Sequence, residues 1–245
     1  MSDEPYLFYY WPGLPGRGEF VRLILEQAGA AYRDVVREHE DAGAGISAMF
    51  ECMGAEGPGP RPLAPPFLVH GELRLAQMPN ICAYLGARHG LAPADEAGRL
   101  TAMQHQLTLA DLVNEAHDTH HPVAVGQVYE EQKVEAARYT KQFLAARMPK
   151  FLGYFETLLQ AGGGRYLVGD ALSYVDLSMN QVLRGLEYAF PRGFAALAGE
   201  LPGLLALRDR VDALEGIAAY RASPRCQPFC EHGIFRRYPE LDLPG

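Results

Sequence analysis

Residues 64–80 read APPFLVHGELRLAQMPN and contain the pattern from which the fold can be worked out. Two apolar runs are separated by Gly71, which predicts a β-hairpin. Proline cannot donate to a strand ladder, so Pro65 and Pro66 belong at the start of the first strand rather than inside it. The next segment, residues 79–90, carries its proline in the first turn of a helical pattern, where helices tolerate it. The stretch therefore predicts strand, strand, helix.

The segment before this hairpin predicts strand, helix, strand. Residues 6–11 are aromatic and β-prone, and a Pro/Gly cluster ends them. Residues 19–30 show helical spacing that closes at a glycine, and residues 32–38 are expected to form a second strand. Residues 42–66 are too rich in glycine and proline to be regular throughout, so we expect a loop there. The order β-α-β, loop, β-β-α defines an α/β unit that we assign to residues 1–90.

The remainder of the chain has a different pattern. Residues 98–220 show long stretches of 3.6-residue period and almost no strand signal, which predicts an all-helical domain over residues 96–245. Ser173 and Asp176 have the spacing of a capping box at a helix start. The tail from residue 223 lacks clean periodicity but keeps several apolar side chains, so we expect it to fold back over the body.

Composition and charge limit the classes of function. The chain has 245 residues, 48% of them hydrophobic, which is enough to bury a full core. Its formal net charge is −8 and no basic block occurs, which argues against binding to nucleic acid or to an anionic membrane. The first residues carry acids where a secretory signal carries Lys or Arg, and no apolar run approaches the ~18 residues of a membrane span. We therefore expect a cytoplasmic protein, and its four scattered cysteines are expected to be reduced.

Three segments, in the same order along the chain, resemble the cytosolic glutathione transferases. Residues 9–26, YYWPGLPGRGEFVRLILE, look like the opening of their tyrosine-type classes. Residues 109–118, LADLVNEAHD, resemble the first helix of their second domain, and residues 155–177 are similar to their late helix and capping-box segment. The resemblance covers roughly residues 6–222. It implies an α/β thioredoxin-like N-terminal domain followed by an all-α helical C-terminal domain.

The resemblance also implies an activity: a homodimer that joins the thiolate of its co-substrate glutathione to a small apolar electrophile. A free thiol has a pKa of about 8.5 and is mostly protonated at neutral pH, whereas the thiolate is the nucleophile. A hydrogen bond from a phenol to the thiolate contributes roughly 1.5–3 kcal/mol, or about one to two pKa units. We assign this role to Tyr10, which directly precedes an aromatic residue as in the family. Strand alternation places Tyr9 on the opposite face.

Further glutathione contacts follow from the same resemblance. Arg17 lies five residues before Arg22, the family's interval between an arginine that faces a glutathione carboxylate and a structural helix arginine. Pro66 lies eleven residues before Gln77, which is the family's interval from its cis-proline, so we expect a cis bond at Pro66. Pro65 departs from the family pattern, because a proline offers the ligand only its carbonyl and one hydrogen bond would be missing.

The charged end of glutathione is assigned to three positions. Gln77 and Met78 stand where the family has Gln followed by Ser or Thr, which receive the γ-glutamyl carboxylate at a helix N-terminus. Met78 supplies no hydroxyl, although backbone N–H groups can still hold the anion. Asp118 falls within one position of a family acid that reaches across a dimer interface toward the glutathione ammonium, with Asp111 as the second choice.

The segment HDTHHP, residues 117–122, is assigned to the second-substrate side. His117 and His121 have the i, i+4 spacing of metal ligands, but no third ligand is apparent nearby in the sequence, so we expect no metal. We place His121 at the electrophile cleft instead. Trp11 and Tyr129 complete this set, the Tyr129 hydroxyl as a donor to charge that develops on the electrophile.

Other outcomes stay open at this point. The same thiolate serves ether cleavage, isomerisation or peroxide reduction, which the sequence does not separate. The departures at Pro65 and Met78 also fit a non-catalytic binding protein that keeps the fold. A cysteine-type enzyme is disfavoured because no cysteine occurs in the first turn.

Overall fold

The N-terminal unit is built around one mixed sheet. The computed structural model describes residues 4–38, 44–57 and 59–242. The unit contains β1 (Tyr6–Tyr9), α1 (Gly18–Gln27), β2 (Tyr32–Asp34), α2 (Gly45–Gly54), β3 (Phe67–His70), β4 (Leu73–Ala76) and α3 (Met78–Arg88). The strand order is β2-β1-β3-β4, with β2 parallel to β1 and the remaining neighbours antiparallel. The predicted strand-helix-strand and the predicted hairpin with its following helix are confirmed.

Two details differ from the expectation for residues 32–66. Strand β2 ends at Asp34, and Val35–Arg37 continues as a short 3-10 helix with both valines buried. The segment expected to be a loop contains α2. Residues 46–53 include neither glycine nor proline, so the residues that break helices flank this short helix instead of interrupting it.

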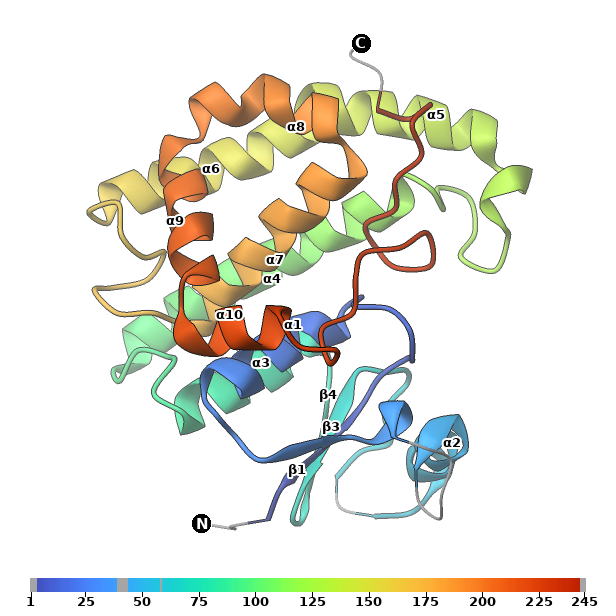
Figure 1. Cartoon of the computed structure of the whole chain (residues 1–245), viewed down its shortest axis with the longest axis vertical. Coiled ribbons are helices and arrows are strands. Elements are labelled where there is room, and N and C mark those ends of the chain that lie inside the picture. Colours follow the sequence, from blue (N-terminus) through green and yellow to red (C-terminus); the bar gives the residue numbers. More distant parts are fainter. Residues whose placement is uncertain (1–3, 39–43, 58, 243–245) are drawn as a thin grey trace.

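The two faces of the sheet are covered differently. Helices α1 and α3 pack against each other on one face, and α2 lies on the other (Figure 1). Phe8 and Phe20 belong to the larger core on the α1 side, whereas Met49 of α2 packs in a smaller cluster with Phe67. Consecutive residues of β1 therefore enter different cores.

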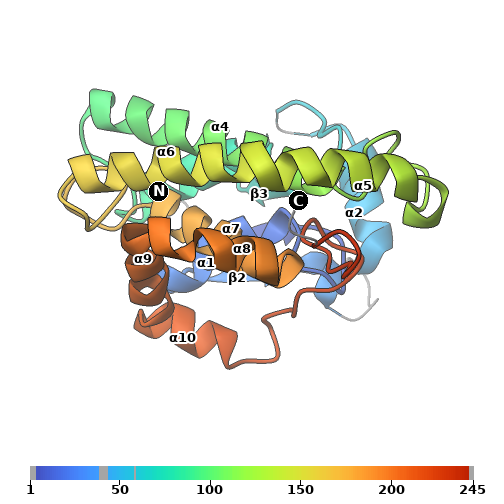
Figure 2. The same cartoon turned by 90° about the horizontal axis from the view of Figure 1, so that it is seen from above.

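The rest of the chain forms the expected helical domain. Its helices are α4 (Glu96–Asp118), α5 (Lys133–Gln142), α6 (Met148–Ala161), α7 (Tyr174–Ala189), α8 (Pro191–Leu197), α9 (Pro202–Asp212) and α10 (Glu215–Arg221). A π-helical turn, Phe143–Arg147, joins α5 to α6, so the two run on as one long helix (Figure 2). Helix α7 is buried along nearly its whole length and packs on α1, α4 and α9. It begins with the predicted capping box of Ser173 and Asp176.

The C-terminal tail folds back over the body, as expected. It runs from α10 past the N-terminal unit and up along the helical domain (Figure 1). Ile234 and Phe235 are buried in the main core. The Asp242 carboxylate accepts hydrogen bonds of 2.9 Å from the backbone N–H groups of Arg192 and Gly193 at the start of α8. The tail is therefore part of the fold, and it places its own backbone next to the end of α4.

The length and polarity of the helices bear on whether they could cross a membrane. Within residues 4–38, 44–57 and 59–242, none of them combines the length and the apolar character that crossing a bilayer requires.

Candidate active site

The two tyrosines at the end of β1 lie on opposite faces of the sheet. Tyr10 is 4% exposed and belongs to the core that α1 and α3 cover. Tyr9 belongs to the α2 cluster, where its ring stacks on Phe67 at a centroid distance of 4.4 Å. The predicted alternation is confirmed, and the chain offers a matched pair of phenols in two different environments.

The turn between β1 and α1 holds the Tyr10 hydroxyl with its backbone. The hydroxyl oxygen accepts a 2.8 Å hydrogen bond from the backbone N–H of Arg17. Gly16 has a φ of +46°, and a Cβ there would overlap the hydroxyl oxygen. A Cβ at Gly18 would lie 2.5 Å from the Tyr10 ring, which is too close for a van der Waals contact. The turn can pass this close to Tyr10 because both glycines lack a side chain. The hydroxyl oxygen accepts the Arg17 N–H, so the phenolic hydrogen is left for another acceptor.

The electrostatics of Tyr10 favour its protonated form. Burial raises the pKa of the hydroxyl above its usual value, and the Arg17 N–H and the charges of Arg17 and Arg22 only partly offset that effect. The phenol is therefore neutral at physiological pH. A neutral phenol that already accepts one hydrogen bond is a donor for an anion placed beside it.

A cavity of about 300 Å³ lies between the start of α3 and one side of α4. Its lining includes Arg17, Gln77 and Met78, three of the residues predicted to hold glutathione. The other lining residues are Pro79, Asn80, Met103, Leu107, Ala110 and Asn114. Tyr10 is not one of the described residues that line this cavity. Arg17 connects the two, because it lines the cavity and its turn holds the Tyr10 hydroxyl.

The start of α3 presents backbone donors to this cavity. Gln77 is exposed and has a φ of +68°, an uncommon backbone conformation for a residue other than glycine. Among the described residues no side chain caps this helix, which leaves the first-turn N–H groups of Met78 and Asn80 for a ligand. The Met78 side chain turns inward, and its sulfur accepts a 3.1 Å hydrogen bond from Gln106 Nε2. The helix start can hold a carboxylate through its backbone alone.

The bond between Pro65 and Pro66 is cis, as the sequence predicted. The register pairs Tyr9 with Phe67, so the residues just beyond this pair, Tyr10 and Pro66, lie at the same end of the sheet. Pro66 is buried and Pro65 is half-buried.

The two arginines of the first turn have separate environments. Arg17 Nη2 donates to Asn114 Oδ1 at 2.7 Å and so reaches from the N-terminal unit to α4. Arg22 is fully buried and donates through Nε to Asp34 Oδ2 at 2.6 Å. This burial fits the structural role expected for Arg22. Asn114 was missed by the sequence argument, although it lies four residues before Asp118 on the same face of the helix.

The acids of α4 differ in position. Asp118 ends the helix with its side chain 46% exposed, and its Oδ1 lies 3.8 Å from Nδ1 of His117. Burial raises the pKa of Asp118, which the positive charge of Arg17 partly offsets. Asp111 is exposed and lies outside the cavity lining. Arg17 and Asp118 are therefore close enough for their charges to interact.

Three histidines meet at the end of α4. His117, His120 and His121 each bring a ring nitrogen within 4.8 Å of the others. His120 Nε2 is 2.7 Å from the carbonyl oxygen of Ile234 in the tail, and its Nδ1 is 2.6 Å from Nδ1 of His121. Burial lowers the pKa of His117 to about 4 and that of His120 to about 2, so the rings are neutral. The premise that no third metal ligand is near His117 and His121 was wrong, because the turn that follows α4 brings the His120 ring beside them.

Trp11 and Tyr129, both assigned to the second substrate, have separate contacts. Trp11 is 38% exposed and meets Phe50 edge to face. Tyr129 is buried, and its hydroxyl donates to Glu240 in the tail at 3.0 Å while its ring stacks on Tyr238. The hydroxyl expected to face the electrophile is thus occupied by a tail carboxylate.

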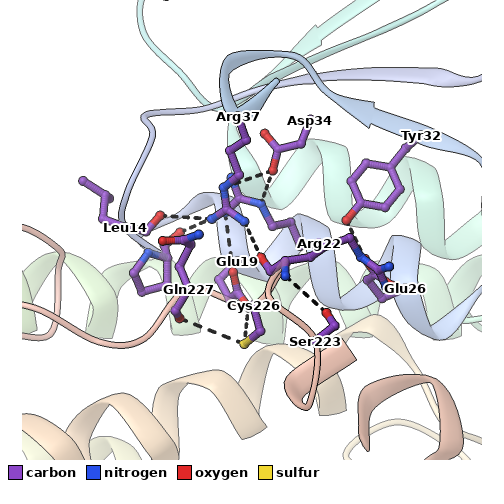
Figure 3. A network of polar contacts seen from close by, with 12 residues as sticks. Leu14, Glu19, Arg22, Glu26, Tyr32, Asp34, Arg37, Ser223, Cys226 and Gln227 are labelled. Carbon is purple, nitrogen blue, oxygen red and sulfur yellow. Dashed lines mark hydrogen bonds and ion pairs between the residues drawn. The ribbon is translucent and has the colours of Figure 1, made fainter. Parts of the chain in front are cut away.

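A cavity of about 680 Å³ lies elsewhere, between the end of α1, β2 and the tail. Several of its polar side chains are bonded to one another, and Figure 3 shows Glu26 with Tyr32 and Arg37 beside Asp34. Glu26 accepts from Tyr32 at 2.6 Å and forms an ion pair with Arg225 at 2.7 Å. Arg37 lies 3.3 Å from Asp34 and donates to the Arg225 carbonyl. These contacts fasten the tail to the N-terminal unit, so the smaller cavity beside Arg17 is the better candidate for the active site.

Comparisons with known proteins agree with this fold. Residues 117–224 match the family model described as Glutathione S-transferase, C-terminal domain. Over 222 residues the chain is 26% identical to Glutathione S-transferase P of Bos taurus, and this alignment covers 90% of this chain and 93% of the relative. Over 231 residues it is 29% identical to Probable glutathione S-transferase 7 of Caenorhabditis elegans, which covers 91% and 98%. The solved structure of prostaglandin synthase D of Nilaparvata lugens has the same fold, with a TM-score of 0.70 at 20% identity over 92% of this chain and 100% of the other. Along about nine tenths of its length the chain is therefore similar to glutathione transferases, and its residues 117–224 match the model of their C-terminal domain.

Proposed function

We propose that the protein joins the thiolate of glutathione to a small apolar electrophile. The observation that carries this proposal is the Tyr10 hydroxyl: the backbone fixes its oxygen, and its hydrogen remains free for a ligand. A thiolate that accepts this hydrogen bond is favoured by roughly 1.5–3 kcal/mol, enough to lower the thiol pKa by about one to two units. The bound nucleophile is then largely ionised at neutral pH.

Glutathione is placed by its charged groups. We assign one carboxylate to Arg17, whose guanidinium lines the cavity, and the γ-glutamyl carboxylate to the open N–H groups at the start of α3. Pro65 offers its carbonyl to the cysteinyl part but has no N–H to donate. One missing hydrogen bond costs about 0.5–1.5 kcal/mol, or up to about tenfold in affinity. Asp118, from a partner subunit, is proposed to meet the glutathione ammonium.

The reaction then needs little more from the protein. The sulfur forms a bond to the electrophilic carbon, the leaving group departs with the electron pair, and Tyr10 keeps its proton throughout. We place the electrophile near Trp11 and the end of α4, with His121 at its edge. Tyr129 could take part only by exchanging Glu240 for the substrate, because its hydroxyl already donates to that carboxylate.

The assembly and the setting are also proposals. We propose a homodimer in the cytoplasm, because the role assigned to Asp118 requires a second subunit. Light scattering coupled to gel filtration measures the assembly directly. A monomer would remove the intersubunit role of Asp118. A glutathione S-transferase of Necator americanus with the same fold is described as monomeric. Its structure matches with a TM-score of 0.66 and 22% identity over 89% of this chain and 96% of the other.

An electrophile panel tests the activity. Aryl halides, epoxides, aryl ethers and hydroperoxides are assayed with added glutathione, using wild type, Tyr10→Phe and Tyr9→Phe. We expect turnover of at least one class, a fall in kcat/KM of about 10- to 100-fold in Tyr10→Phe, and a change below about twofold in Tyr9→Phe. The class that reacts identifies the chemistry. Turnover that is absent in wild type, or unchanged in Tyr10→Phe, would contradict the proposal.

A further inference from the structure

The end of α4 carries a side-chain cluster that the glutathione chemistry does not use. His117 lies in the last turn of α4, which ends at Asp118, and the following turn brings the rings of His120 and His121 beside it. We propose that these histidines bind a divalent transition-metal ion, with Zn²⁺ as the reference ion. Three imidazoles with one open position form a common zinc ligand set, and imidazole nitrogens suit zinc, copper and nickel better than magnesium or calcium.

The hydrogen bonds around the cluster orient His120 as a ligand. Its Nε2–H donates to the Ile234 carbonyl at 2.7 Å, which leaves Nδ1 without a proton and turned toward His121. Metal-binding histidines usually donate their other N–H in this way, which fixes the ring and its tautomer. The Asp118 carboxylate lies 3.8 Å from Nδ1 of His117, which is too far for a hydrogen bond but leaves an acceptor near that ring.

The separations require only a small adjustment. The ring nitrogens lie within 4.8 Å of one another, and the nearest two, on His120 and His121, are 2.6 Å apart. Two nitrogens bound to tetrahedral zinc at about 2.0–2.1 Å lie roughly 3.3–3.4 Å from each other. The closest pair must therefore open by less than about 1 Å, and a pair at the 4.8 Å limit must close by about 1.4 Å.

The local charges decide what kind of ion fits. Arg236 lies close enough for its positive charge to act on all three rings, and Arg17 acts on His117. These positive charges repel a cation, so electrostatic attraction alone would not hold one at this site. Direct bonds from three nitrogens must supply the affinity, which favours a borderline transition metal over a hard cation. A bound ion would also fix the tail to α4, because His120 holds the backbone of Ile234.

The test uses full-length protein stripped of metal by a chelator and titrated with zinc in competition with a fluorescent chelator. We expect one zinc per chain, a loss of at least about 100-fold in affinity in His117→Ala and in His121→Ala, and no change in His232→Ala, which removes an exposed tail histidine. His117→Ala is the primary variant because this side chain is 16% exposed and its loss disturbs the core least. Circular dichroism confirms that each variant is folded.

X-ray absorption at the zinc edge identifies the ligands. We expect nitrogen ligands at about 2.0–2.1 Å and no sulfur. Sulfur in the shell would assign the ion to a cysteine site and overturn the proposal, as would substoichiometric binding or an affinity unchanged in His117→Ala. Glutathione turnover plays no part in either measurement, so the metal site and the transferase activity succeed or fail separately.

Discussion

The turn after β1 and the end of α4 are organised in different ways. In the turn, Tyr10 is held by the backbone of residues only six to eight positions away, through the Arg17 N–H and the bare Cα atoms of Gly16 and Gly18. Beyond the end of α4, His120 and Tyr129 are held by the tail, through partners 114 and 111 residues away. The first region is fixed by local chain geometry, and the second depends on long-range docking.

The largest effect is expected from Gly16→Ala. The added Cβ would overlap the Tyr10 hydroxyl, and the residue must keep a positive φ, so we expect kcat/KM to fall about 100-fold and the free energy of unfolding to fall by about 2 kcal/mol. Gly13→Ala is the matched control: Gly13 has a φ of +72° in the same turn, but in the described part of the chain no atom beyond its two neighbours in sequence lies within 4 Å of an added Cβ. It should lose about 1 kcal/mol of stability and keep its rate. Equal rate losses in both variants would show that turn strain, rather than contact with Tyr10, sets the activity.

A smaller effect is expected from Arg17→Ala, which separates the two roles of this residue. The backbone N–H to Tyr10 survives, whereas the guanidinium in the cavity is lost. The KM for glutathione should rise about tenfold and kcat should change less than about threefold. Arg33→Ala removes an exposed arginine paired with Glu38 and should change neither parameter. A large fall in kcat with an unchanged KM would place Arg17 in the chemical step instead.

The smallest effect is expected from Tyr129→Phe, which probes the tail-dependent region. The variant loses one hydrogen bond to Glu240, so the free energy of unfolding should fall by about 1 kcal/mol and kcat/KM should stay within about twofold. Chemical denaturation and steady-state kinetics measure the two quantities. Glu240→Gln should reproduce the stability loss. A tenfold fall in rate would mean that this hydroxyl leaves the tail and acts on the electrophile.

The same division explains what could be predicted from the sequence. The hairpin after Pro66 and the opposite faces of Tyr9 and Tyr10 follow from local periodicity and turn chemistry, and the structure has them. Helix α2 was missed because its flanking glycines and prolines dominated the pattern. His120 was missed because only the i, i+4 pair was considered, although its i+3 position was visible.

Contacts made by the tail could not be predicted in the same way. Nothing in the local sequence around Tyr129 indicates a carboxylate that lies 111 residues further along the chain. Asn114 is an intermediate case. Its position on the face of α4 could be predicted, but its contact with Arg17 depends on how the two domains pack.

The central claim, that the Tyr10 hydroxyl stabilises the thiolate, is tested most directly by titrating glutathione bound to the protein and following the ultraviolet absorbance of the thiolate. Because burial raises the pKa of Tyr10, its phenol stays protonated while the thiol ionises, and a single transition is expected. In wild type and Tyr9→Phe its midpoint should lie about one to two units below the free thiol value of about 8.5, so the thiolate forms at lower pH. In Tyr10→Phe the midpoint should return toward the free value. A wild-type midpoint equal to that of free glutathione, or a shift that Tyr9→Phe abolishes and Tyr10→Phe retains, would contradict the account.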